Sequence, residues 1–557
     1  MAEVDVLVVG SGAGALAAAN RALDNGLTVK IVEKTEYWGG TSAISGGALW
    51  LPVNGQYPTD SRAMARQYML SCIGEGADVD RVDAYLDRVS QTISFLGSKG
   101  VALAANNEYP DYCQHFEGAL PGGRTMDPQP YDGKRLGEHF HTLRDQLPFM
   151  KVFGRISLSN PEGRLLSTRR KGWVKLLLSM STAYWFDIPW RLKTSRGSRL
   201  TMGSSLVAPL GEALFKRGLR IDLQHRLRSI ERDGSDFLVT LDTPEGPKTV
   251  VAANIILGCG GFEHNAALRA GYMAEGARPD HSASPAGANT GDALLSAQKL
   301  GAAVVNAGNA WWAPIVRGPM AGVEDAPYVL FMERASPGGI IVNKRGVRFT
   351  NEAKSYNDFG LDMIADQERT GGTSDVWLVF DAGFRKRYMV GPLMAGSIQP
   401  DKALPSGWLG RVFYRADSVS ELAGQIGVPA AALEQTVARF NEHAVDHVDP
   451  DFGRGDNVYD RYFGDANFAN PNIAPLAHGP FYAMRIMLGD LGTNGGLRTD
   501  RDARVLDARG VSIEGLFAIG NTAASVMGQS YPGAGGTLGP AVSFGIAAAD
   551  AAATRHH

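Results

Sequence analysis

A tyrosine followed by a glycine-rich run near the C-terminus has the residue types of a site that stabilises a negatively charged oxygen. Residues 531–539 read Tyr-Pro-Gly-Ala-Gly-Gly-Thr-Leu-Gly, which places a phenol beside backbone that glycines leave accessible. A phenol O–H and a backbone N–H that point at one position can stabilise charge developing on a substrate oxygen. Tyr531 and the amide of Gly535 are therefore candidates for polarising a carbonyl group.

Other groups that commonly carry catalysis lack their usual spacing. The histidines include no His-Glu-x-x-His pattern, and Cys72, Cys113 and Cys259 form no Cys-x-x-Cys pair. The sequence therefore predicts no metal site and no disulfide framework, and a reducing compartment fits best. The stretch 203–205, Gly-Ser-Ser, also lacks the flanking glycines of a nucleophile elbow.

The N-terminus has the pattern of a strand, a tight glycine turn and a helix. A β-branched run at 4–9 precedes Gly-Ser-Gly-Ala-Gly-Ala at 10–15 and an alanine-rich stretch to Leu23. The turn fits G-x-G-x-x-G/A, in which glycines let the backbone and the helix N-terminus approach a pyrophosphate. A second predicted strand, 28–32, ends at Glu33, which suits a ribose hydroxyl. This order predicts a Rossmann-type dinucleotide site.

The next segment favours a flavin. Residues 37–47 supply small side chains and hydroxyls suited to lie beside a flat ligand. Here the chain resembles the FAD-dependent fumarate reductase and 3-ketosteroid dehydrogenase superfamily, through the Gly-Gly-Thr-Ser of 39–42, the strand and glycine turn at 254–262, and the strand at 515–521. The resemblance covers nearly the whole chain. It implies FAD, and because no histidine lies between Tyr37 and Trp50 we expect the flavin to be bound non-covalently.

The residues expected to contact FAD come from the two ends of the chain and from its middle. They are Gly10, Ser11, Gly12, Ala13, Gly14, Ala15, Glu33, Lys34, Gly39, Gly40, Thr41, Ser42, Ser45, Gly46, Gly47, Gly260, Gly261, Asn289, Asp292, Gly520, Asn521, Gly536 and Leu538.

Three tyrosine segments resemble those of 3-ketosteroid Δ1-dehydrogenases within this superfamily. In that family the tyrosine and last glycine of Tyr-Pro-Gly-x-Gly hold the steroid 3-keto oxygen, places taken here by Tyr531 and Gly535. The family's base matches Tyr356 in Asn-Glu-x-x-x-Tyr, and a tyrosine that hydrogen-bonds the base matches Tyr112 in Pro-Asp-Tyr. The implied reaction is a 1,2-desaturation, in which a proton leaves ring carbon 2 and a hydride passes from ring carbon 1 to FAD.

Several alternatives stay open. A 3-ketosteroid Δ4-(5α)-dehydrogenase would share the FAD segments and the substrate class, whereas a fumarate reductase needs an arginine acid and cationic groups for two carboxylates. A non-enzymatic lipid carrier of the GDP-dissociation-inhibitor kind would not need an intact flavin cradle. Residues 113–116, Cys-Gln-His-Phe, need not line the steroid pocket. The steroid itself, including a sterol with an intact side chain such as cholest-4-en-3-one, the electron acceptor, for example a quinone, and the oligomeric state are left open.

The expected fold class is α/β, with a discontinuous Rossmann-type FAD-binding domain and an inserted α+β catalytic domain. The FAD-binding domain would comprise residues 1–305 and 486–557, and the catalytic domain residues 306–485. Within the insert we expect a hairpin made by 338–343 and 347–352 and an amphipathic helix at 431–444.

A basic segment stands out from a nearly neutral chain. The whole chain has a net charge of −3, which argues against nucleic acid as a partner, yet residues 151–200 contain eleven basic and two acidic residues. Trp173, Leu176, Leu177, Met180 and Tyr184 fall at helical spacing on one face, with Trp185 and Trp190 just beyond. The pattern predicts either contact with a membrane surface or a packed helix with a solvated basic edge.

No apolar run approaches the length of a spanning helix. We therefore expect a cytoplasmic protein with possible peripheral membrane contact. The terminal Arg-His-His at 555–557 is excluded from the interpretation because it could belong to a tag.

Overall fold

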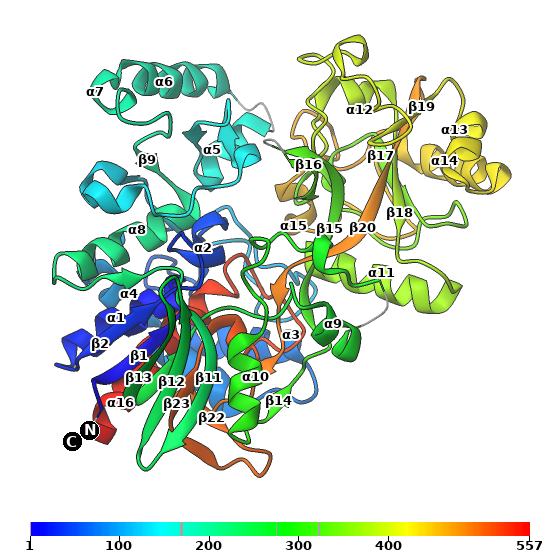
Figure 1. Ribbon diagram of the computed structural model, residues 1–557. Helices are drawn as coiled ribbons and strands as arrows, with labels where there is room; N and C mark the ends of the chain where they lie inside the picture. Colours follow the sequence, from blue (N-terminus) through cyan, green and yellow to red (C-terminus); the bar gives the residue numbers. More distant parts are fainter. Residues whose placement is uncertain (1, 168–170, 274–275, 321–322, 557) are drawn as a thin grey trace.

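The computed structural model describes residues 2–167, 171–273, 276–320 and 323–556 (Figure 1). Helices and strands alternate along much of the chain, and the strands gather into two large sheets. In Figure 1 the first sheet lies below with both chain ends at its edge, and the second lies above it on the other side. The expected mixed α/β fold is confirmed.

The first sheet combines a parallel part with an antiparallel extension. The parallel strands have the order β10-β2-β1-β13-β23. On the edge of β13 opposite β1, residues 255–257 pair with β23, whereas residues 246–252 pair with the antiparallel β12, which in turn pairs with β11. The parallel strands are buried and strongly apolar, as strands covered on both faces must be. The strands are β1 (Val4–Val9), β2 (Val29–Val32), β10 (Ile221–Asp222), β11 (Arg226–Asp233), β12 (Asp236–Thr243), β13 (Gly246–Leu257), β22 (Arg504–Leu506) and β23 (Ser512–Ala518).

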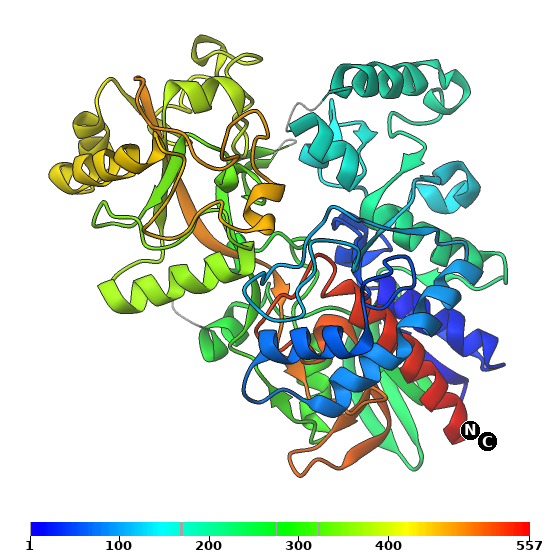
Figure 2. The same ribbon diagram turned by 180° about the vertical axis from the view of Figure 1, so that it is seen from behind.

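Helices from both ends of the chain cover this sheet. Helix α1 (Ala13–Asp24) packs along α16 (Leu538–His556), and α16 also contacts α4 (Val79–Ser98). Figure 2 shows this group from behind, with the red α16 beside the blue N-terminal helices. Gly14 permits the contact, because a Cβ there would lie 2.6 Å from the carbonyl oxygen of Ala541.

The second sheet is antiparallel and is formed by residues 310–493. Its order is β16-β15-β20-β18-β17, with β19 on β20. Helix α11 (Tyr356–Thr370) packs on β15 near the junction of the two sheets, and α13 (Val419–Ile426) and α14 (Ala430–Ala444) pack together at the far side (Figure 1). The strands are β15 (Ala310–Met320), β16 (Val323–Val329), β17 (Gly339–Val342), β18 (Val376–Phe380), β19 (Tyr414–Ala416) and β20 (Phe481–Thr493).

The hairpin predicted at 338–352 is wrong in its second half. β17 and the turn at Lys344–Gly346 form, but residues 347–352 are not a strand and β17 pairs with β18 instead. The backbone N–H of Ile341, which a hairpin partner would bind, donates to the Glu352 carboxylate at 3.1 Å. Glu352 is in turn bound by Arg348 and Arg454, so a buried charge cluster replaces the expected ladder.

A separate lobe is formed by the basic segment. It contains α5 (Asn160–Ser167), α6 (Trp173–Phe186) and α7 (Ile188–Arg191) and lies at the edge of the molecule in Figure 1. The predicted helix is confirmed. Its predicted apolar face packs inward, since Met180 and Tyr184 are buried against Ile156. Arg169 and Arg170 lie outside the described residues.

Candidate functional site

One cavity of about 1200 Å³ lies between the first sheet, the second sheet and the lobe. Its wall includes the turn after β1, the segment 40–48, the turn at 258–260 and the start of α16. Most residues expected to contact FAD line it, as do Tyr112, Tyr356, Tyr531 and Gly535. The fold thus brings together segments more than 500 residues apart in the chain.

Three of the residues predicted to contact FAD lie outside this wall. Local packing and backbone conformation explain why each of them is a glycine. Gly39 has φ +104° and caps the short helix α2 (Gly40–Ile44). A Cβ on Gly261 would lie 1.8 Å from the Thr493 hydroxyl oxygen, and one on Gly536 would lie 3.3 Å from the carbonyl oxygen of Gly533. These glycines therefore permit a turn or a close approach between two segments beside the cavity.

The turn after β1 has the geometry of a phosphate cradle. Gly10 has φ +106°, and a Cβ there would lie 2.4 Å from the carbonyl oxygen of Gly258. Gly12 caps α1 without any side-chain hydrogen bond, so the first N–H groups of α1 face the cavity with few protein acceptors. Among the described residues, a side chain accepts from one of these amides, that of Ala13, which lies 3.0 Å from Ser42 Oγ.

Acidic and basic groups define the end of the cavity beyond β2. Ser11 Oγ donates to Glu33 at 2.6 Å, and the backbone N–H and hydroxyl of Thr35 donate to its other oxygen. Lys34 Nζ lies 3.1 Å from Asp292. Burial alone would raise the pKa of Asp292, but hydrogen bonding from Arg226 and the charge of Lys34 outweigh it and lower that pKa.

The segment from Thr41 is held by a buried amide. Asn289 Nδ2 donates to Thr41 Oγ1 at 3.1 Å and to Glu263 at 2.5 Å. Burial and the charge of Asp490 raise the pKa of Glu263 to about 7. Glu263 was not predicted from the sequence, because a lone glutamate after a glycine turn carries no motif.

Three tyrosines from distant segments meet at the cavity wall. Tyr356 is the first residue of α11, whose N-cap is Ser355, while Tyr112 and Tyr531 lie on loops. The rings of Tyr112 and Tyr531 are nearly parallel, with their centroids 5.4 Å apart. The Tyr356 ring lies edge-on to both, at centroid distances of 5.7 Å from Tyr112 and 5.3 Å from Tyr531. The hydroxyls of Tyr531 and Tyr112 both lie near enough to the Tyr356 hydroxyl to affect its pKa.

Electrostatics keep these phenols protonated in the described structure. Burial raises the pKa of Tyr356 well above 10, and although the hydrogen bond from Tyr112 lowers it, burial outweighs that effect. Burial likewise raises the pKa values of Tyr112 and Tyr531. The backbone amide of Gly535 favours the Tyr531 phenolate and so opposes the effect of burial on the pKa of Tyr531, which shows that the two groups proposed to bind a substrate oxygen are neighbours.

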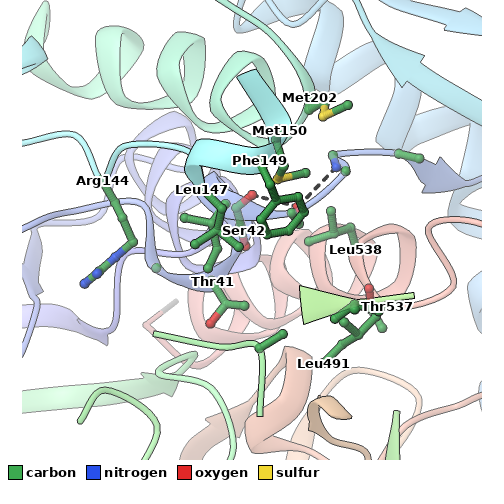
Figure 3. A pocket seen from close by; sticks show the side chains of 18 of the residues that line it. Thr41, Ser42, Arg144, Leu147, Phe149, Met150, Met202, Leu491, Thr537 and Leu538 are labelled. Carbon is green, nitrogen blue, oxygen red and sulfur yellow. Dashed lines mark hydrogen bonds between the residues drawn. The ribbon is translucent and has the colours of Figure 1, made fainter. Parts of the chain in front are cut away.

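Several residues of the wall were missed by sequence reasoning. Tyr109 extends the tyrosine cluster, its hydroxyl lying 3.2 Å from that of Tyr112, and Arg144 donates to Thr35 Oγ1 at 2.8 Å. Figure 3 shows Phe149 and Met150 on one side of the pocket and Leu538 on the other. Tyr109 could have been found from its position three residues before Tyr112, but the apolar residues carry no motif.

In the described part of the chain, no group of three or more His, Cys, Asp or Glu is placed to hold a metal ion. The three cysteines are free thiols. No helix in the described ranges is long and apolar enough to cross a membrane.

The similarity of this chain to known proteins extends over the segments that line the cavity. Residues 5–538 match the FAD binding domain family. The chain is 39% identical to the 3-oxosteroid 1-dehydrogenase of Mycolicibacterium smegmatis, over 99% of this chain and 98% of that protein, and 36% identical to that of Comamonas testosteroni, over 98% and 96%. The chain belongs to the 3-ketosteroid Δ1-dehydrogenase family.

Structural similarity agrees with this assignment. The 3-ketosteroid Δ1-dehydrogenase of Sterolibacterium denitrificans, solved with 1,4-androstadiene-3,17-dione, superposes with a TM-score of 0.94 at 41% identity and 99% coverage of both chains. The predicted family and its FAD cofactor are thereby confirmed. A fumarate reductase and a 3-ketosteroid Δ4-(5α)-dehydrogenase share only the fold, at 21% and 22% identity and TM-scores of 0.65, so neither alternative is favoured.

Proposed function

We propose that this protein catalyses the FAD-dependent 1,2-desaturation of 3-ketosteroids. The observation that carries the proposal is the meeting of Tyr112, Tyr356 and Tyr531 on the wall of the cavity that the FAD-binding segments line. The Δ1-dehydrogenase relatives at 36–41% identity support it.

Each tyrosine has a distinct role in this mechanism. The Tyr531 hydroxyl and the Gly535 amide donate to the steroid C3 oxygen and stabilise the enolate that forms when carbon 2 loses a proton. Tyr356 takes that proton as the base, and Tyr112 donates a hydrogen bond that favours the Tyr356 phenolate. Bound in the cavity, FAD would supply the acceptor for the hydride that leaves carbon 1.

The residues of the cradle fit FAD. The uncapped N–H groups of α1 suit a pyrophosphate, and the Glu33 carboxylate beyond β2 suits a ribose hydroxyl. Between Tyr37 and Trp50 no histidine is available for covalent attachment, so we propose non-covalent binding.

We propose that the two sheets belong to two domains with different functions. The parallel first sheet is a Rossmann-type FAD-binding domain formed by both ends of the chain, and the second sheet is the core of an inserted catalytic domain. The insert starts near residue 306. We place its end near residue 494 rather than 485, because β20 runs through position 485 and pairs with β15 up to Thr493.

The apolar part of the cavity supports a steroid substrate with room for a side chain. Beyond the tyrosines the wall includes Met389, Met394 and Ile398 from one loop and Trp173 and Leu177 from α6. Such a wall suits a long hydrocarbon, so we propose that sterols with an intact side chain, such as cholest-4-en-3-one, are accepted as well as androgens.

The test is anaerobic mixing of the yellow protein with three ketones while flavin absorbance is followed. We expect 4-androstene-3,17-dione and cholest-4-en-3-one to bleach the flavin. A relative named for 4-oxocyclohexanecarboxylate is 34% identical, so that small charged ketone is the third substrate and is expected to leave the flavin oxidised. Bleaching by the carboxylate alone would overturn the steroid assignment.

We further propose peripheral membrane contact through the outer face of α6 and α7. This face differs from the predicted one: Trp173 lines the cavity, whereas Leu178, Phe186 and Leu192 are 62, 77 and 84% exposed. Apolar side chains on the surface of a basic segment are the composition of an interfacial helix.

A further inference from the structure

The loops that carry Tyr112 and Tyr531 are joined to each other by one backbone hydrogen bond. The N–H of Tyr112 donates to the carbonyl oxygen of Pro532 at 2.9 Å. This contact leaves the carbonyl with a second lone pair, and it fixes only one point on each loop.

A buried tyrosine on a helix also connects these two loops. The hydroxyl of Tyr68, on α3 (Arg62–Ile73), donates to the same Pro532 oxygen at 2.6 Å and accepts the backbone N–H of Cys113 at 3.0 Å. One oxygen atom therefore binds the residue after Tyr112 and the residue after Tyr531. Tyr68 is fully buried and does not line the cavity.

The ring of Tyr68 is held by a buried charge cluster. The Arg124 guanidinium lies 5.3 Å from the ring centroid and binds Asp60 at 2.8 Å and Asp111 at 2.7 Å. Asp111 also accepts the indole N–H of Trp50 at 2.8 Å. Since Asp111 directly precedes Tyr112, the cluster fixes both the Tyr68 ring and the loop its hydroxyl binds.

The hydroxyl keeps the proton that it donates. Burial and the nearby Asp111 carboxylate raise the pKa of Tyr68 well above 10. Pro532 offers only a carbonyl acceptor, so a neutral phenol is the form that satisfies both hydrogen bonds.

We propose that Tyr68 is a positioning residue for the desaturation, whose hydroxyl sets the separation between Tyr112 and Tyr531. The inference rests on the proposed function and names a group that never touches substrate. The stacked pair at 5.4 Å lets both hydroxyls reach Tyr356, and a displacement of about 1 Å at reacting groups can cost about 10²-fold in rate.

The test compares Tyr68→Phe with Tyr131→Phe. Tyr131 is also buried, and its hydroxyl donates to Glu212 at 2.7 Å away from the cavity. Both variants therefore lose a buried phenolic hydroxyl, with two hydrogen bonds removed at Tyr68 and one at Tyr131. We expect Tyr68→Phe to retain FAD, to lower kcat on 4-androstene-3,17-dione and the rate of exchange of the carbon-2 hydrogens by the same factor of about 10 to 100, and to change KM less than threefold.

We expect Tyr131→Phe to keep kcat although its unfolding temperature falls below that of wild type. Equal kcat in wild type and Tyr68→Phe would overturn the proposal, as would equal losses of kcat in the two variants. If wild-type protein fails to bleach with any steroid, the proposed function fails instead.

A second variant decides the matter if Tyr68→Phe does not accumulate as a flavoprotein. p-Aminophenylalanine at position 68 keeps the ring and an N–H donor to Pro532. We expect it to retain at least a third of wild-type kcat, and a loss of tenfold or more would overturn the proposal.

Discussion

Tyr531 is the single residue whose removal tests the oxyanion role most directly. Its hydroxyl and the Gly535 amide are neighbours at the cavity wall, and we propose that both donate to the substrate oxygen. Loss of one donor to a developing oxyanion typically costs about 10²- to 10³-fold in rate. We expect Tyr531→Phe to retain FAD and lose turnover by that factor, measured by steady-state kinetics with the flavin spectrum as the control. More than half the wild-type rate would contradict the role.

Tyr356 determines the expected pH dependence. The phenolate is the active form of the base, and burial raises the pKa of this phenol well above 10, so its ionised fraction rises about tenfold with each pH unit below that pKa. We expect kcat/KM to increase from pH 7 to 9 with no plateau. Tyr356→Phe should abolish both turnover and exchange of the carbon-2 hydrogens with solvent deuterium. Wild-type exchange in that variant would place the base elsewhere.

At the scale of elements, the turn between β1 and α1 can be tested with two glycines. Gly10 and Gly26 both have positive φ, +106° and +81°, so alanine strains the backbone at each. Only at Gly10 would the Cβ also collide with another segment, the carbonyl of Gly258, whereas nothing lies within 4 Å at Gly26. We expect Gly26→Ala to cost about 1 kcal/mol of unfolding free energy with FAD retained. Gly10→Ala should cost more and release FAD, measured by denaturant unfolding and the flavin to protein ratio.

The outer face of α6 and α7 makes a second element-scale prediction. Each basic residue near an anionic surface contributes about 1 kcal/mol, and exposed apolar side chains add contacts that salt does not screen. We expect the protein to float with anionic liposomes at low salt and to be released only partly at high salt. Replacing Leu178, Phe186 and Leu192 by Ser should weaken flotation at low salt and allow high salt to release the protein completely.

The matched control for this surface replaces Leu409 and Val511 by Ser, because both are exposed by more than half and lie outside the lobe. That variant should float like wild type. Wild-type protein that stays at the bottom of the gradient at low salt would show that the lobe is a packed helix with a solvated basic edge.

For the whole molecule, the cavity makes FAD part of the folded structure. Its wall joins the first strand of the chain, the turn after β13, the start of α10 (Asp292–Lys299) and the start of α16. A ligand bound only by the folded state stabilises it by RT ln(1 + [L]/Kd), about 2.7 kcal/mol at one hundred times Kd. We expect the FAD-free protein to melt at a lower temperature, and its Tm to rise steadily with added FAD. A Tm independent of FAD would contradict this arrangement.

Local patterns determined much of this protein. The strand, turn and helix at the N-terminus and the helices expected at 173–184 and 431–444 depend on neighbouring residues, so residue types and spacing were sufficient to predict them. The meeting of Tyr112, Tyr356 and Tyr531 was expected from a family resemblance, and no local pattern could have predicted it.

Only the tertiary structure decided the features that depend on residues distant in the chain. The edge of β17 opposite β18 has no strand partner among the described residues, because the Glu352 side chain occupies the Ile341 amide that a hairpin would use. Gly261 faces Thr493 instead of the cavity. The exposed face of α6 is the one opposite the predicted stripe, and Tyr68 joins two loops although no motif surrounds it. The spacing of apolar residues along a helix or strand shows which face of it is apolar. Which residues are buried also depends on the segment that packs against that helix or strand, and this segment is distant in the sequence.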